Sequence, residues 1–164
     1  HTGIRISELV SLDVKDINWN DRCFKVIRKR GNEDIVYFDN TTERVLLDWL
    51  DERTNLKETL GITDDNEPAL FISTKGRNRG TRLSVRSVER MVKKYAEIAV
   101  PEVKGMHVHS LRSTCATNVY EKSHDLVYTK SLLGHSSVNT TMRYVKDDEQ
   151  KKKDNRTLLD REKE

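Results

Sequence analysis

The segment from residue 14 to residue 38 most constrains the fold, because its hydrophobic pattern differs from that of the chain on either side. It holds three short runs rich in β-branched and aromatic residues: Val14–Trp19, Arg22–Arg28 and Asp34–Phe38. The turn formers Asn20-Asp21 and Gly31-Asn32 separate these runs. Short β-favouring runs joined by such turns predict a three-stranded antiparallel meander.

The rest of the chain shows helical spacing of apolar residues, so the expected fold class is α+β, mostly helical with one small antiparallel sheet. Helix signals are expected at these places: directly after Gly3, at Asn40 with Glu43 completing a capping box, after a Ser84 cap and before Pro101, at roughly 109–122, and at 125–133. A short extended run is expected at 69–72, a helical turn at 137–144, and a highly charged helix at the C-terminus.

Composition limits the class of protein. The 164 residues fit one domain, with 35% hydrophobic and 35% charged residues. No apolar run approaches the roughly 18 residues of a membrane-spanning helix, and we expect no signal peptide. Cys23 and Cys115 are the two cysteines, and no Cys/His spacing resembles a zinc site. We therefore expect a cytoplasmic protein with reduced thiols.

The positive charge is concentrated in two places. The formal net charge is +3, but basic residues gather in two turn-like stretches: Arg28, Lys29 and Arg30, and then Lys75, Arg77, Arg79 and Arg82. Two basic loops can grip a polyanion. Among these residues, the candidate DNA contacts are Arg28, Arg30, Lys75, Arg77, Arg79 and Arg82.

Several residues could carry chemistry, although each one alone is more commonly structural. His109 and Arg112 are three apart and would share a helix face. His135 follows Gly134 at an expected helix end, and Tyr144 comes nine residues later. A lone tyrosine is usually a packing residue.

In combination, these residues suit chemistry on a phosphate. Arg5, Arg112 and Lys29 are cations, two histidines can donate or shuttle protons, and no carboxylate cluster suggests a metal. Two arginines could neutralise the charge that grows on a pentavalent phosphorus. A tyrosine can then act as a covalent nucleophile.

In content and order, three motifs resemble the catalytic domain of the tyrosine recombinases, the phage-integrase family. These are Thr2-Gly-Ile-Arg5-Ile-Ser-Glu8-Leu9, His109-Ser-Leu-Arg112, and Leu133-Gly-His135 followed by Tyr144. The family's β-hairpin lysine matches Lys29, although the glycines that often flank it are arginines here, which leaves Arg30 as a rival. Ser113 stands where relatives often have histidine.

The resemblance implies a metal-independent DNA strand transfer without a cofactor. Arg5 and Arg112 would clamp the scissile phosphate, and Glu8 would brace Arg5. Tyr144 would form a 3′-phosphotyrosyl bond while Lys29 protonates the 5′-oxygen. His109 would serve in proton transfer, and His135 would hydrogen-bond the phosphate.

The resemblance also implies a domain layout and partners. Residues 1–146 would form the catalytic domain, with its first helix and an N-terminal core-binding domain missing, so we expect weak DNA binding from this piece. Residues 147–164 would form a charged helix that docks on a neighbouring protomer. The implied partners are double-stranded DNA, three further copies in a tetramer, and accessory DNA-bending or directionality factors in a bacterial cytoplasm. The implied biological role is integration or excision of a mobile element.

Three other interpretations are kept open. A DNA-binding protein of the same fold could lack catalysis and use Tyr144 for packing. A type IB topoisomerase or telomere resolvase would share the chemistry but relax DNA or act without paired sites. A purely structural helical module would leave the arginine and histidine motifs to chance.

Overall fold

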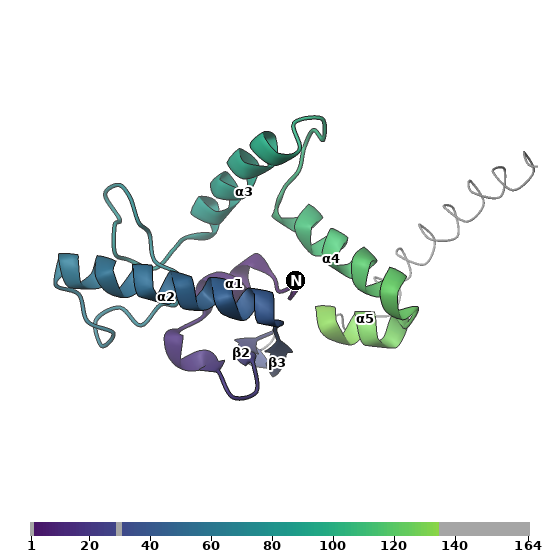
Figure 1. The fold of residues 1–164 in the computed structure, drawn as a ribbon, viewed down its shortest axis with the longest axis horizontal. Coiled ribbons are helices and arrows are strands. Elements are labelled where there is room, and N and C mark those ends of the chain that lie inside the picture. Colours follow the sequence, from purple (N-terminus) through teal and green to yellow (C-terminus); the bar gives the residue numbers. More distant parts are fainter. Residues whose placement is uncertain (1, 29–30, 135–164) are drawn as a thin grey trace, which may run out of the picture. The chain divides into compact units, whose positions relative to one another are not determined.

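The computed structural model describes residues 2–28 and 31–134 of the chain (Figure 1). The chain divides into two compact units, residues 1–112 and residues 113–164, and the boundary falls inside helix α4. The elements are α1 (Ile6–Ser11), the 3₁₀ turn η1 (Val14–Asp16), β1 (Ile17–Asn18), β2 (Cys23–Ile27), β3 (Glu33–Tyr37), α2 (Asn40–Leu60), α3 (Val85–Ala99), α4 (Val108–Ser123) and α5 (Leu126–Leu133).

The expected antiparallel meander is confirmed. The strands lie in the order β1-β2-β3, and Phe24 of β2 stands opposite Ile17 on one side and Val36 on the other. The prediction of a first strand over 14–19 was too long, because residues 14–16 form η1 instead. There the side chain of Asp16 accepts a hydrogen bond from the backbone N–H of Asp13 at 2.8 Å. Short acidic side chains that bind nearby backbone groups compete in this way with strand formation.

Alternation along the strands builds the main core of the first unit. Phe24 and Val26 of β2 and Val36 of β3 are buried, while their sequence neighbours Lys25 and Ile35 are exposed. The core cluster comprises Leu12, Ile17, Phe24, Val26, Val36, Phe38, Leu46 and Leu70. Because Leu46 lies on α2, the apolar face of the sheet packs against that helix.

Helix α2 begins at Asn40 as expected, but its cap is Asp39 rather than Asn40. The chain is extended at Asp39, whose carboxylate accepts the backbone N–H of Thr42 at 2.8 Å. That hydrogen bond holds the pKa of the Asp39 carboxyl below its ordinary value. The helix ends at Gly61, which has a left-handed conformation with φ 64°.

Two buried cations on α2 hold the segment from residue 63 to residue 69. The Arg53 guanidinium donates to the carbonyl oxygen of Ala69 at 2.8 Å and to Asp64 at 2.7 Å. The Lys57 ammonium donates to Asp64 at 2.8 Å and to the carbonyl oxygens of Thr63 and Glu67 at 2.7 and 2.6 Å. Hydrogen bonds from Lys57 and Arg53 lower the pKa of Asp64. This polar anchor leads into the short extended run expected at 69–72, which forms isolated bridges to Asp13 and Arg82.

The basic loop after this run is closed by backbone hydrogen bonds. Ser73 N–H donates to the carbonyl oxygen of Thr81 at 2.8 Å, and Gly80 N–H donates back to that of Ser73 at 2.7 Å. Within this loop Gly80 is buried, whereas three basic residues are exposed: Lys75, Arg77 and Arg79.

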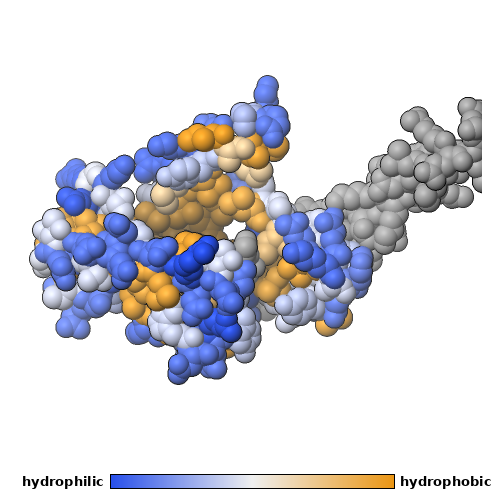
Figure 2. All heavy atoms as spheres, viewed as in Figure 1, coloured by the Kyte–Doolittle hydropathy of each residue, from blue (hydrophilic) through white to orange (hydrophobic). Residues whose placement is uncertain are grey.

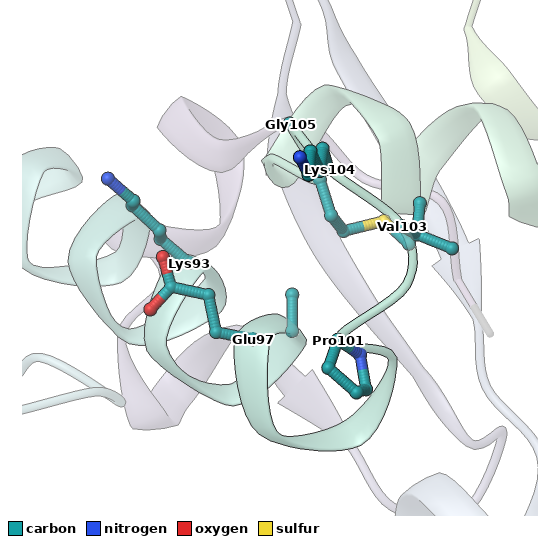
Figure 3. A pocket seen from close by; sticks show the side chains of 8 residues that line it. Lys93, Glu97, Pro101, Val103, Lys104 and Gly105 are labelled. Carbon is teal, nitrogen blue, oxygen red and sulfur yellow. The ribbon is translucent and has the colours of Figure 1, made fainter.

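Helix α3 confirms the expected Ser84 cap and ends at Ala99, before Pro101. Val88 is buried, whereas Tyr95 and Ile98 are 63% and 68% exposed. Hydrophobic residues gather along this helix (Figure 2). At its C-terminal end, α3 and the loop from 101 to 106 line a small pocket with both apolar and charged side chains (Figure 3).

The second unit consists, within the described residues, of the later turns of α4 and of α5. Ala116 and Leu133 form its buried core. Asp125 caps α5 by accepting the Tyr128 N–H at 2.9 Å, and the helix ends at Gly134. The helices expected at 109–122 and 125–133 are thus confirmed within one residue. The expected turn at 137–144 and the terminal helix lie outside the described residues.

The structure was also searched for membrane-spanning helices and for metal-ion sites. In the described parts of the chain, no helix is both long and apolar enough to cross a bilayer. Over the same residues, no group of three or more His, Cys, Asp or Glu side chains is placed to hold a metal ion.

We expect Gly80→Ala to lower the free energy of unfolding by about 1–3 kcal/mol, more than Gly76→Ala. Both glycines have positive φ, 85° and 76°. A Cβ on Gly80 would lie 2.6 Å from Cδ1 of Ile62 and 2.7 Å from Cδ1 of Leu60, whereas one on Gly76 would meet no atom within 4 Å. Urea unfolding of both variants measures the difference. Equal losses of stability in the two variants would show that contact of the new Cβ with Ile62 and Leu60 costs nothing.

Candidate functional site

Helix α1 positions the first arginine through an ion pair within one helical turn. Arg5 is the extended residue that precedes the helix, and Glu8 lies three residues on. The Arg5 backbone N–H donates to Glu8 Oε2 at 2.8 Å, and Arg5 Nη1 donates to Glu8 Oε1 at 2.6 Å. Glu8 is 3% exposed while the Arg5 side chain is 35% exposed. The carboxylate therefore holds an arginine that still reaches solvent.

Arg28 also binds the Glu8 carboxylate. Arg28 Nη1 donates to Glu8 Oε2 at 3.1 Å, and Arg28 Nε donates to Asp34 Oδ2 at 2.9 Å. The Arg28 side chain is only 9% exposed. The guanidinium of Arg28 thus faces two carboxylates of its own chain, which disfavours the predicted contact with DNA.

Glu8 is stabilised as an anion. Burial by itself would raise the pKa of its carboxyl. The hydrogen bonds from the backbone and side chain of Arg5, together with the charges of Arg28 and Arg5, outweigh burial and hold the pKa below its ordinary value.

The second arginine of the expected clamp lies beside the segment that leads into α1. Arg112 is on the first turns of α4 and is 8% exposed. Its Nη1 donates to the carbonyl oxygen of Gly3 at 2.5 Å. Because Gly3 is two residues before Arg5, this bond brings the regions of the two arginines together across most of the sequence.

The start of α4 carries the expected histidine and one that sequence reasoning missed. His109 is exposed, and its ring centroid lies 6.3 Å from that of His107. His107 Nδ1 accepts the backbone N–H of Ser110 at 3.0 Å, which is the role of an N-cap side chain. Its place just before the expected start of the helix is the sequence feature that could have indicated this role for His107. Because α4 also carries Arg112, this cap helps to order the clamp.

Four of the expected site residues lie outside the described residues: Lys29, Arg30, His135 and Tyr144. Lys29 and Arg30 follow Arg28 directly in sequence. Around them, Arg28 N–H donates to the carbonyl oxygen of Asn32 at 2.7 Å, and Gly31 N–H donates to that of Arg28 at 3.1 Å. For these four residues the roles stay predictions.

Arg82, another candidate DNA contact, has an internal role. Its Nη1 donates to the carbonyl oxygens of Val10 and Leu12 at 3.0 and 3.2 Å, and its Nη2 pairs with Asp13 at 2.5 Å. These carbonyls belong to the C-terminal end of α1, where helix carbonyls lack partners. Arg82 therefore anchors α1, and the exposed candidates that remain are Lys75, Arg77 and Arg79.

Comparison with known proteins settles the family. The model of the phage integrase family matches residues 1–151. The chain belongs to the phage integrase family. The tyrosine recombinase XerC of Shewanella amazonensis is 38% identical over 143 residues, which are 87% of this chain and 44% of that protein. Like a second XerC, from Corynebacterium glutamicum, it is matched over less than half its length.

Solved structures of the family share the fold. The XerA recombinase superposes with a TM-score of 0.73 at 31% identity, covering 88% of this chain and 48% of XerA. The XerH recombinase, bound to a palindromic difH substrate in a post-cleavage complex, gives a TM-score of 0.76 at 26% identity, covering 97% of this chain and 43% of XerH. The observed architecture, mostly helical with a three-stranded antiparallel sheet, is thus that of the tyrosine recombinases.

We expect Glu8→Gln to lower the free energy of unfolding at neutral pH by about 3 kcal/mol, because the buried guanidinium of Arg28 and the partly exposed one of Arg5 lose their anion. The loss should shrink as the medium is acidified. Since the folded-state pKa of Glu8 lies below the ordinary 4.5, its stabilisation is present above that value and is lost as pH falls through the folded-state pKa. Urea unfolding across this pH range measures the difference between the two proteins.

The matched control is Glu33→Gln, since Glu33 is 61% exposed and pairs with Lys25 on the surface. It should change stability by less than about 1 kcal/mol. A Glu8→Gln loss that stayed constant at all pH values would contradict the assignment.

Proposed function

We propose that this chain is the catalytic part of a site-specific DNA recombinase that cleaves and rejoins DNA through a 3′-phosphotyrosyl intermediate. The observation that carries the proposal is the hydrogen bond from Arg112 to Gly3, beside the Arg5–Glu8 pair. It brings the two arginines of the expected phosphate clamp to one region of the first unit. Family membership supports the same reaction.

Two guanidinium groups suit the chemistry of a phosphodiester. Each presents a rigid fork of N–H donors that matches phosphate oxygens. In the proposed reaction, Arg5 and Arg112 bind the two non-bridging oxygens and stabilise the charge that grows on them at the pentavalent transition state. Glu8 fixes the orientation of Arg5 and does not touch the DNA.

In the proposed reaction the bonds exchange without an external energy source. Tyr144 Oη attacks phosphorus, the bond from phosphorus to the 5′-oxygen breaks, and Lys29 gives that oxygen its proton. His109 accepts the proton that Tyr144 Oη loses, and His135 donates a hydrogen bond to the phosphate. Attack by the 5′-hydroxyl of a partner strand then reverses the step, releases Tyr144 and seals the new junction.

The proposal extends to double-stranded DNA as substrate and to assembly of four protomers on it. XerH, 26% identical, is described as bound to its difH DNA substrate, which supports DNA as the substrate here. Integration or excision of a mobile element is the setting we propose from the family description, although the curated relatives matched are XerC recombinases.

We expect the chain to form a covalent adduct with nicked duplex DNA, and Tyr144→Phe to abolish the adduct while binding persists. Because the target site is unknown, the substrate is a random-sequence duplex library that carries one nick near its centre. Departure of the short fragment at the nick prevents resealing and traps the intermediate. Mass spectrometry of the captured peptide locates the bond, and sequencing of the captured DNA reveals the site. An adduct formed by Tyr144→Phe would refute the nucleophile, whereas binding without any adduct would favour the non-catalytic interpretation.

We expect the exposed loop cations to contact DNA phosphates. Replacing Lys75, Arg77 and Arg79 together by alanine should flatten the plot of log affinity against log salt by up to about 2.7, which is roughly 0.9 per lost contact. The control removes Lys15 and Arg44, two exposed cations outside the loop, and should leave the slope unchanged. Filter binding on one captured duplex gives both slopes, and an equal change per cation would show that the loop has no special part in binding.

A further inference from the structure

Arg28 is the cation whose observed place departs most from its expected one. It lies directly after β2, next to the expected general acid Lys29 in sequence, where a DNA contact would be natural. Its side chain is instead 9% exposed and pairs with Glu8 and Asp34. Two carboxylates already neutralise this guanidinium and would repel a phosphate that approached it.

The four charged groups form a connected chain. Arg5 binds Glu8 at 2.6 Å, Glu8 binds Arg28 at 3.1 Å, and Arg28 binds Asp34 at 2.9 Å. Two positive and two negative charges alternate, so the formal charge of the set is zero. This balance allows Glu8 and Arg28 to be buried, because each one has two partners of opposite sign.

The chain of ion pairs joins two separate elements. Arg5 and Glu8 belong to the start of α1, whereas Arg28 and Asp34 stand at the turn end of the β2–β3 hairpin. The backbone of Arg28 also closes the turn, through its bonds with Asn32 and Gly31. One residue therefore fixes the base of the turn that contains Lys29 and the carboxylate that orients Arg5.

We propose that Arg28 is a positioning residue of the site, which acts through Glu8 to orient Arg5. Its part in DNA cleavage rests on the proposed function. Its part in ordering Arg5 does not, and can be measured without DNA.

The first experiment follows the Arg5 side chain by NMR. In Arg28→Gln, nitrogen relaxation of the Arg5 Nε–H group should show greater mobility, and a carbon titration should show a higher pKa for Glu8, because one of its two cations is gone. Asp34→Asn should increase the mobility of Arg5 by less. It removes the other anchor of Arg28, and since Asp34 is 42% exposed the variant keeps the core intact. Unchanged Arg5 mobility and Glu8 pKa in both variants would overturn the proposal.

The control is Lys25→Gln on the same pair of strands. Lys25 pairs with Glu33 at 2.6 Å, and these side chains are 46% and 61% exposed. This variant removes one cation and one ion pair from the hairpin without touching Glu8. It should leave Arg5 mobility and the Glu8 pKa as in the parent. If Lys25→Gln changed Arg5 mobility and the Glu8 pKa as much as Arg28→Gln does, the cause would be a general loosening of the hairpin. That result would overturn the proposal.

The second experiment measures adduct formation in a single turnover at saturating DNA. Arg28→Gln should slow the reaction roughly 10- to 100-fold, as expected when a catalytic group is misplaced by about 1 Å. The salt slope of binding should stay unchanged, whereas loss of a phosphate contact would lower it by about 0.9. A lowered slope would make Arg28 a DNA contact and overturn the proposal.

Two further variants test whether Arg28 acts through Glu8. Arg28→Gln added to Glu8→Gln should cost little more rate than Glu8→Gln alone, since residues that act as a unit are not additive. Arg28→Lys keeps a cation beside Glu8 and should recover part of the lost rate. Fully additive losses, or no recovery in Arg28→Lys, would each contradict the proposal. If the parent chain forms no adduct, the proposed function fails, and the NMR experiment still decides the role of Arg28.

Discussion

The described part of the site depends on the two ion pairs that the Glu8 carboxylate makes. It is nearly inaccessible to solvent and is held between the guanidinium groups of Arg5 and Arg28. An isolated buried carboxylate would be protonated, because burial penalises its charged form. Here the two cations keep it anionic, and the anion in turn fixes both cations. Helix α1 and the β2–β3 hairpin are thus tied together by charge beside Arg5.

Cations engaged in internal hydrogen bonds recur elsewhere in the first unit. Arg53 and Lys57 hold the segment that leads to Ala69 and Leu70, and Arg82 binds the carbonyl end of α1. In each case a long side chain donates to backbone carbonyls and to one carboxylate. A chain with 35% charged residues and a small apolar core uses such groups to order segments that hydrophobic contacts alone would leave loose. The apolar stem of each side chain adds packing while its head is satisfied by hydrogen bonds.

These internal ties explain why charge in the sequence was an incomplete guide to DNA contact. Six basic residues in two stretches carried the same expectation of contact with DNA. The described structure separates Arg28 and Arg82, which are engaged with carboxylates and carbonyls, from Lys75, Arg77 and Arg79, which are exposed on a closed loop. Nothing local distinguishes the two groups, because the partners of Arg28 and Arg82 lie 6 to 72 positions away in the sequence. Their distinction from surface cations is a property of long-range packing.

Local patterns were sufficient for the elements and their order. The β-favouring run between the turn formers Asn20-Asp21 and Gly31-Asn32 predicted the strand β2, Ser84 predicted the start of α3, and motif order pointed to the family that the comparison confirmed. These features depend on side chains within a few residues of one another, which the sequence displays directly. The cap of α2, the shortened first strand and the N-cap role of His107 depend on which of several nearby polar groups wins a local hydrogen bond, and the sequence pattern leaves that choice open. The place of Arg28 was decided by tertiary structure, because Glu8 reaches its guanidinium only when the start of α1 meets the β2–β3 hairpin.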